Sequence, residues 1–275
     1  MMDRRGFLSL GAGAALASLL PRPLFARLQG DPAYAGFAMG IQTYSLRAFD
    51  FDRVLEIMKD LGLKNAEFFG GKQMQVTDDK AKIDGWKQKL DAAGIRIMAF
   101  GVQGFSKDHA ANKKSFEFAK AMGFSCFSAN PSADSFESLA ELTKEYGVTI
   151  AIHNHGPEDK RYGKLEQVQA AVSKWPEAIG VCVDTGHVLR AGEDPVQWIK
   201  ALGPRVHDVH LKDASAPNTF HIVGKGKLDT VGVLKTLREV KFKGCLALEY
   251  ELSEKDPVAD IKECLAATRE ACQKL

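Results

Sequence analysis

Residues that bind metals or transfer protons stand at the ends of four short apolar runs in the second half of the chain. The runs read IAIHNHG (150–156), IGVCVD (179–184), VHDVHL (206–211) and CLALEYE (245–251). The side chains concerned are His153, Asp184, His210 and Glu249. Imidazoles and carboxylates suit proton transfer or the binding of a divalent cation. Whether they act together depends on the elements that carry them.

These four runs belong to a longer alternation. Short apolar or β-branched runs, as expected for strands, cover residues 38–44, 64–69, 95–100, 124–129, 148–153, 179–184, 206–211 and 245–250. Segments of helical period lie between and after them, over residues 51–61, 79–93, 110–122, 135–146, 165–174, 195–202, 228–240 and from 257 onward. Eight strand–helix units predict a (β/α)8 TIM barrel. An open, doubly wound sheet is the alternative, but no GxGxxG motif follows the first run.

Side-chain alternation places the four polar residues on one face. Successive side chains of a strand point to opposite sides, and the large apolar set should pack on the helices. His153, Asp184, His210 and Glu249 then point into the barrel at the carboxyl ends of four consecutive strands. Two carboxylates buried together are costly unless a cation neutralises them. The pattern therefore predicts one divalent metal ion, and mixed N/O ligands suit manganese, cobalt, zinc, iron or nickel.

The same motifs resemble those of the xylose isomerase-like barrel superfamily, often labelled sugar phosphate isomerase/epimerase. The resemblance covers essentially the whole chain after residue 37 and is carried by IAIHNHG, VDTGH (183–187), HLKD (210–213) and LALEYE (246–251). It implies that His153, Asp184, His210 and Glu249 are the ligands of one metal ion. One position departs from the pattern, because related epimerases have glutamate where this chain has His153.

Further site residues follow from the resemblance or from position. His155 and His187 match pocket groups that contact sugar hydroxyls, or that orient the metal ligands. Lys212 and Asp213 follow His210 closely, and each is either a pocket contact or part of a loop ion pair. Candidates by position alone, near the ends of other strands, are Gln42, Tyr44, Asn130 and Glu67.

The exchange of one glutamate bears on the reaction. Related epimerases use two metal-bound glutamates to move a proton beside a carbonyl, with an enediolate as intermediate. A metal-bound imidazole has no free lone pair, so His153 cannot be the second base while it is a ligand. We expect a sugar isomerase or epimerase that abstracts an α-proton, with Glu249 as base and His153 and His155 as the other candidate catalytic groups. The alternative is a lyase or hydratase, or an enzyme that cleaves 3-keto-glycosides.

Composition and charge argue against other classes of protein. With 45% hydrophobic and 26% charged residues, the chain has the composition of an ordinary globular protein. Metal-dependent endonucleases share this barrel but need more ligands and a basic face, whereas the chain without residues 1–26 is formally neutral. We expect a small-molecule carbohydrate as partner, with no nucleic acid and no stable membrane partner; a homo-oligomer stays open. A carbohydrate-binding protein without turnover is the remaining alternative.

The first residues have the features of an export signal. The stretch DRRGFL, which contains Arg4 and Arg5, resembles the twin-arginine motif, and a short Gly/Ala/Leu run follows it. Cleavage is expected after Ala26 or as late as Ala35. We expect a periplasmic or otherwise exported protein in which residues 37–275 form a single catalytic domain.

Two weaker features complete the pattern. The cysteines form no CxxC pair and are predicted to be packing residues; they are Cys126, Cys182, Cys245, Cys264 and Cys272. The stretch GKGKLD (224–229) is a Gly-Lys-Gly loop and only a weak candidate for phosphate binding.

Overall fold

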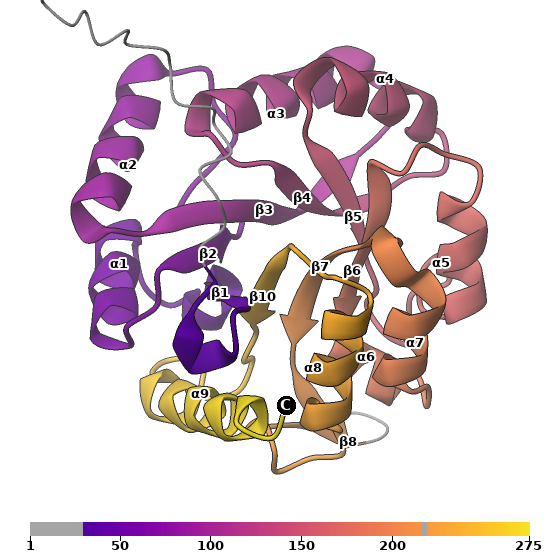
Figure 1. Ribbon diagram of the computed structural model, residues 1–275. Coiled ribbons are helices and arrows are strands. Elements are labelled where there is room, and N and C mark those ends of the chain that lie inside the picture. Colours follow the sequence, from indigo (N-terminus) through magenta and orange to yellow (C-terminus); the bar gives the residue numbers. More distant parts are fainter. Residues whose placement is uncertain (1–29, 216–218) are drawn as a thin grey trace, which may run out of the picture.

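Parallel strands form a closed barrel ringed by helices in the computed structural model (Figure 1). The structure describes residues 30–215 and 219–275, so the predicted export signal lies outside the described residues. Around the barrel the strands follow the order β1, β10, β7, β6, β5, β4, β3, β2 and back to β1. The predicted (β/α)8 barrel is confirmed, and the open sheet is excluded. The barrel strands are β1 (Ala38–Gln42), β2 (Asn65–Phe68), β3 (Arg96–Phe105), β4 (Cys126–Pro131), β5 (Thr149–His153), β6 (Ile179–Asp184), β7 (Val206–Leu211) and β10 (Cys245–Leu248).

Each expected helical segment forms a helix. These helices are α1 (Phe51–Asp60), α2 (Lys80–Ala93), α3 (His109–Met122), α4 (Phe136–Tyr146), α5 (Leu165–Val172), α7 (Pro195–Leu202), α8 (Thr230–Glu239) and α9 (Val258–Cys272). Local signals set their limits. Asp50, Asp79 and Asp108 accept backbone N–H groups at the starts of α1, α2 and α3. Gly94 and Gly123 end α2 and α3 with positive φ angles of 67° and 89°.

Several short elements were not predicted. They are the helix α6 (Thr185–Arg190), the hairpin strands β8 (Asp213–Ser215) and β9 (Thr219–His221), and the 3-10 turns η1 (Pro32–Tyr34), η2 (Thr43–Leu46) and η3 (Gly203–Arg205). Elements of three to six residues are too short to show a hydrophobic period. Two of them matter for function, because α6 and the hairpin follow the carboxyl ends of β6 and β7.

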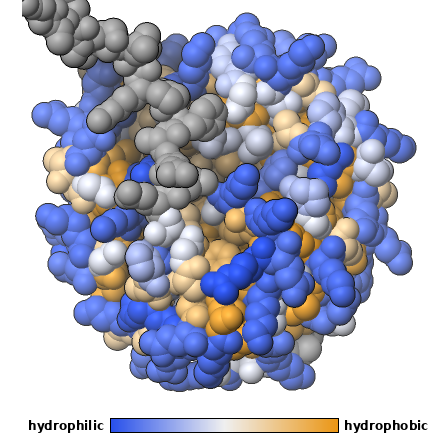
Figure 2. Space-filling view, viewed as in Figure 1, coloured by the Kyte–Doolittle hydropathy of each residue, from blue (hydrophilic) through white to orange (hydrophobic). Residues whose placement is uncertain are grey.

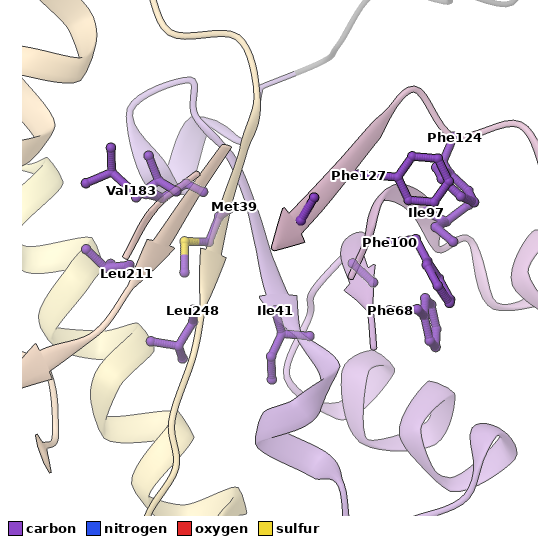
Figure 3. Packing of buried hydrophobic residues seen from close by; sticks show 14 of the residues in the cluster. Met39, Ile41, Phe68, Ile97, Phe100, Phe124, Phe127, Val183, Leu211 and Leu248 are labelled. Atoms are coloured by element: carbon purple, nitrogen blue, oxygen red, sulfur yellow. The ribbon is translucent and has the colours of Figure 1, made fainter. Parts of the chain in front are cut away.

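The large apolar side chains of the strands pack outward against the helices, as side-chain alternation predicts. Phe68, Phe100 and Phe127, on β2, β3 and β4, are fully buried with the nearby Phe124 (Figure 3). The ring of Phe100 stacks on Phe124 with centroids 5.8 Å apart. Strand residues of the opposite parity are smaller and form a second cluster, made of Ala99, Cys126, Ala151 and Cys182. All five cysteines are buried and unpaired.

The first and last elements of the described chain meet at the closure of the barrel. β1 pairs in parallel with β10, with Ala38 opposite Cys245, and α9 lies beside η1. In Figure 2 one face of the molecule is mostly hydrophilic, with hydrophobic atoms only in small patches between charged side chains. Within residues 30–215 and 219–275, no helix is both long and apolar enough to span a membrane.

Candidate active site

Four polar side chains meet at the carboxyl end of the barrel, as predicted from the sequence. His153, Asp184, His210 and Glu249 are buried, and one nitrogen or oxygen atom of each lies within 4.8 Å of the others. Strand register produces this arrangement, because Asp184 lies opposite His210 on the paired strands β6 and β7. His153 Nε2 is 3.4 Å from Asp184 Oδ2, and His210 Nδ1 is 3.1 Å from Glu249 Oε2.

Backbone contacts fix the directions of these side chains. Asp184 caps α6, because its Oδ1 atom accepts the N–H of His187 at 2.8 Å, which leaves Oδ2 toward the cluster. Asn154 joins β5 to β6 through both ends of its amide. Its Oδ1 accepts the N–H of Asp184 at 2.9 Å, and its Nδ2 donates to the carbonyl of Asp184 at 3.2 Å. The asparagine between the two histidines therefore holds the end of one strand against the next.

Glu67, on β2, orients His210 from the far side of its ring. Glu67 Oε2 lies 2.9 Å from His210 Nε2, so a proton on Nε2 leaves Nδ1 as the acceptor that faces the cluster. The other oxygen of Glu67 accepts hydrogen bonds from Gln42 Nε2 at 2.6 Å and from the Ser128 hydroxyl. Burial raises the pKa of Glu67, but His210, Asp208 and the Ser128 hydroxyl outweigh it and lower the pKa to about 2.

A second carboxyl group next to Glu67 does not require a cation. Asp208 is buried on β7, and its pKa is raised well above the usual range by burial and by the carboxylate of Glu67. A proton on Asp208 leaves the pair with one negative charge and so removes the like-charge repulsion. Glu67, Asp208 and His210 also lie close enough to bind a metal together, and neither carboxyl oxygen of Asp208 has a hydrogen-bond partner among the described residues.

The four-residue cluster suits a divalent metal ion, because each of its residues has a buried nitrogen or oxygen atom without a hydrogen-bond partner in the part of the chain that the structure describes. Within the described chain, both ring nitrogens of His153, Asp184 Oδ2, His210 Nδ1 and Glu249 Oε2 are buried without a hydrogen-bond partner. Such atoms are rare in folded proteins unless an ion or water binds them. Two imidazoles and two carboxylates are a common donor set for divalent transition metals.

The ammonium group of Lys212 lies beside the same oxygens. Lys212 Nζ is 2.9 Å from Asp184 Oδ2 and 2.7 Å from Glu249 Oε2, without the alignment of a hydrogen bond, and it donates to Glu251 Oε1 at 2.5 Å. Gly186 makes room for this buried chain, because a Cβ atom there would lie 2.6 Å from Lys212 Cγ. The structure thus places Lys212 in the site.

Charges within the cluster determine its protonation. Burial raises the pKa of Glu249, but Lys212 and His210 outweigh it and hold this pKa well below the usual range. Burial likewise opposes ionisation of Asp184, whose pKa is lowered by the charges of His187, Lys212 and His153. Desolvation is the main cause of a pKa lowered to about 4 for His155 and to about 3 for His187. Near neutral pH, the site therefore contains ionised carboxylates and neutral rim imidazoles.

The other predicted site residues lie at different distances from the cluster. The ring of His155 is 4.4 Å from that of His153, and His187 is 5.7 Å from His155. Asn130 Nδ2 lies 3.3 Å from His155 Nδ1, which places Asn130 on the same rim. Tyr44 is farther out and 37% exposed.

Gln42 lies deeper than a substrate-contacting residue would. It is buried, and its Nε2 donates to Glu67 and to the carbonyl of Gly101, while its Oε1 accepts the N–H of Tyr44. These contacts give Gln42 a positioning role toward Glu67. This geometry does not support a direct contact between Gln42 and a substrate, which stays a prediction.

Several rim residues were not expected from the sequence. Arg161 donates to Asn130 Oδ1 and, at 2.9 Å, to the carbonyl of Pro131. Arg190 lies 2.9 Å from His187 Nδ1. The Phe220 ring of β9 lies 5.0 Å from Lys212 Nζ and 5.6 Å from the His187 ring. These residues belong to short elements or loops without a motif, so only an i,i+3 spacing on α6 could have signalled Arg190 next to His187.

The GKGKLD stretch binds a carboxylate of the chain itself. The N–H groups of Gly224, Gly226 and Leu228 each donate at 2.9 Å to the buried carboxylate of Asp213. A Cβ atom at Gly226 would lie 2.3 Å from Asp213 Oδ1. The loop therefore anchors the start of the β8–β9 hairpin, and the weak phosphate-binding reading has no support here.

Comparisons with known proteins agree with this fold. Residues 55–271 match the family model described as xylose isomerase-like TIM barrel. An inosose dehydratase of Clostridium botulinum is 24% identical over 62% of this chain and 62% of its own length, and one of Lacticaseibacillus casei is 22% identical over 61% and 60%. The chain thus spans less than two thirds of these curated relatives.

Solved structures show the same fold. An uncharacterised protein from Parabacteroides distasonis is 27% identical, with a TM-score of 0.66 over 86% of this chain and 98% of that one. A 3-keto-D-glucoside 4-epimerase from E. coli is 15% identical, with a TM-score of 0.69 over 85% of this chain and 99% of that one.

Proposed function

Because the chain belongs to the xylose isomerase-like TIM barrel family, we propose that it is a divalent-metal-dependent enzyme acting on a keto-sugar or a related cyclic ketone. In the proposed reaction it removes the proton beside the carbonyl and then eliminates a substituent from the next carbon. One observation carries the proposal: four buried donor atoms without hydrogen-bond partners converge at the catalytic end of the barrel.

The metal would be held by His153, Asp184, His210 and Glu249. When bound, a divalent ion supplies Lewis-acid stabilisation of negative charge on the substrate oxygen. The chain prepares this site through Glu67 behind His210 and through the cap at Asp184. Both contacts leave one donor atom of the ligand free.

Glu249 is the proposed base. Its lowered pKa keeps it ionised near neutral pH, so its carboxylate can take the proton from the carbon beside the carbonyl. Lys212 Nζ, 2.7 Å away, is a protonated group beside this carboxylate. It can donate a proton to the departing hydroxyl or alkoxide, which leaves as water or an alcohol, while the electron pair of the broken C–H bond forms the new C=C bond. The proton taken up by Glu249 can then pass to Lys212, which restores both groups.

Elimination is favoured over epimerisation by the number of carboxylates. Epimerisation with two opposed bases needs a second carboxylate, and His153 stands at that position. Two curated relatives of the chain are inosose dehydratases, which supports an elimination on a cyclic keto-polyol. The 3-keto-D-glucoside 4-epimerase has the same fold at 15% identity, which makes epimerisation the second candidate rather than the first.

We also propose that the reaction takes place outside the cytoplasm. The support is Arg4 and Arg5 in the DRRGFL stretch alone. Exchange of both arginines for lysine should retain the protein inside the cell, as measured by fractionation.

Metal content and turnover test the proposed function. Purified protein should contain close to one equivalent of a divalent transition metal. Asp184→Ala should reduce that content, with a loss of metal affinity greater than the roughly 10- to 100-fold typical of residues that only orient ligands. Asp194→Ala, which removes an exposed cap of α7, is the matched control.

Turnover is then measured on inososes and 3-keto-glucosides, with α-proton exchange followed by NMR in deuterated water. Unchanged metal content in Asp184→Ala would overturn the proposed site. If the α-proton exchanged with solvent and the substrate lost no substituent, the result would favour epimerisation over elimination.

A further inference from the structure

The exposed large apolar residues of the described chain gather at one end of the barrel. They are Tyr44, Val102 and Leu252, which are 37%, 37% and 41% exposed. Tyr44 follows β1, Leu252 follows β10, and Val102 lies on β3 beyond the point where Phe100 pairs with the end of β2. All three therefore stand at the carboxyl ends of strands, on the same face as the metal-ligand candidates. Scattered exposed apolar residues are ordinary, but their restriction to the catalytic face is not.

These residues also occupy neighbouring strands. β3, β2, β1 and β10 are consecutive around the barrel, and Phe69 follows β2. The Phe69 ring packs edge-on against Tyr44 with centroids 5.4 Å apart. We call Tyr44, Phe69, Val102 and Leu252 the apolar arc.

The remaining half of the rim is polar. β4 to β7 and the segments after them bring Asn130, His155, His187 and Lys212 to the rim, and Arg161 and Arg190 extend it outward. Hydroxyl groups of a sugar find donors and acceptors on this half. Of the side chains in the apolar arc, only Tyr44 carries a hydrogen-bonding group, its hydroxyl.

A short chain of contacts joins the apolar arc to the reacting position. The Arg47 guanidinium lies 4.7 Å from the centre of the Tyr44 ring and donates to the Glu251 carbonyl at 3.1 Å. The carboxylate of Glu251 in turn accepts from Lys212, which lies 2.7 Å from Glu249. The apolar arc thus borders the site rather than a remote surface.

We infer that the apolar arc binds an apolar, preferably aromatic, substituent of the substrate. The inference rests on the proposed function and narrows it to a keto-glycoside whose aglycone leaves or remains attached at this side. A free sugar has no apolar group large enough to cover these side chains. An aryl group would cover these side chains and remove apolar surface from water, which favours binding.

Paired substrates and binding probes test the inference separately from the proposed function. For turnover, kcat/KM is compared between phenyl and methyl 3-keto-β-D-glucoside. We expect wild type to favour the phenyl compound by about 10- to 100-fold, the range for differences in apolar contact. Val102→Ala and Leu252→Ala should each lower this ratio several-fold. Val231→Ala trims a half-buried side chain on the outer helix α8 and should keep the wild-type ratio.

Binding is measured in parallel by saturation-transfer NMR with the unoxidised phenyl and methyl β-D-glucosides, which require no turnover. Stronger binding of the phenyl compound, weakened in Leu252→Ala, supports the apolar arc even if no keto-sugar reacts. Equal binding and equal kcat/KM for both compounds would overturn the inference. So would a wild-type dimer that Leu252→Ala dissociates in size-exclusion chromatography, because a second copy would then cover the arc.

Discussion

Each polar residue of the site uses some of its atoms for structure, and the atoms left over define the chemistry. Asp184 caps a helix with one oxygen and presents the other, while His210 faces Glu67 with one nitrogen and the cluster with the other. The sequence predicts which residues meet, because side-chain alternation and strand order follow simple rules. It does not predict which ring nitrogen of His210 faces the cluster, because that depends on Glu67, which lies 143 residues away in the chain.

Glu249→Gln tests the assignment of the base. The amide still offers an oxygen to the metal, so most of the metal should remain bound, while α-proton exchange should fall by about 10² to 10⁴, the usual contribution of a positioned base. Metal analysis and exchange in deuterated water measure the two effects.

Glu254→Gln, at an exposed glutamate paired with Arg47, is the control for loss of a carboxylate. Wild-type exchange in Glu249→Gln would move the role of base to His155 or His187, the rim imidazoles nearest the cluster.

At the level of elements, the loops after the barrel strands were harder to predict than the strands themselves. Strand and helix periods revealed the barrel, but the β8–β9 hairpin has only three residues per strand. Its placement depends on Asp213, whose carboxylate accepts three backbone N–H groups of the following loop. GKGKLD resembles an anion-binding loop because several of its backbone N–H groups point to one place. The anion that they bind is the carboxylate of Asp213 in the same molecule.

Asp213→Asn tests this anchor. The amide keeps the shape but removes the charge and places an NH₂ group among N–H donors, so the free energy of unfolding should fall by about 2 to 3 kcal/mol. Urea denaturation measures the change. Asp229→Asn removes a carboxylate from the cap of α8, where only the Gly232 N–H is bound, and should cost about 1 kcal/mol or less. Equal losses for the two variants would show that Asp213 is no special anchor.

Across the whole molecule, the two ends of the barrel have different roles. The carboxyl end holds the candidate metal ligands and the exposed apolar residues, whereas the amino end is tightly packed around Gly180. There, a Cβ atom at Gly180 would lie 2.6 Å from the His207 ring and 2.3 Å from the Arg205 carbonyl. The eight alternating strand and helix segments of the sequence predicted a barrel with these two ends. Alternation also points His210 into the barrel and His207 to the other side of β7, but it could not predict the contact of His207 with the Ile150 carbonyl, which joins residues 57 apart in the chain.

His207 should make the protein sensitive to acid. Desolvation is the main cause of its lowered pKa; Arg205 lowers it further, while hydrogen bonds to Ile150 and Glu177 and the charge of Glu177 oppose the shift. Below about pH 6.5 the unfolded chain takes up a proton that folded His207 refuses, so the free energy of unfolding falls as pH decreases toward the folded pKa. The slope from this residue is at most about 1.4 kcal/mol per pH unit.

His207→Gln should therefore lose less stability than wild type between pH 7 and pH 5. Urea denaturation of metal-free protein measures this difference and avoids the pH dependence of metal binding. His109→Gln, at an exposed histidine that begins α3, controls for the exchange itself. If the free energy of unfolding changed with pH in the same way in wild type and His207→Gln, another group would cause the loss of stability in acid. The carboxylates and imidazoles of the site would then be the next residues to substitute.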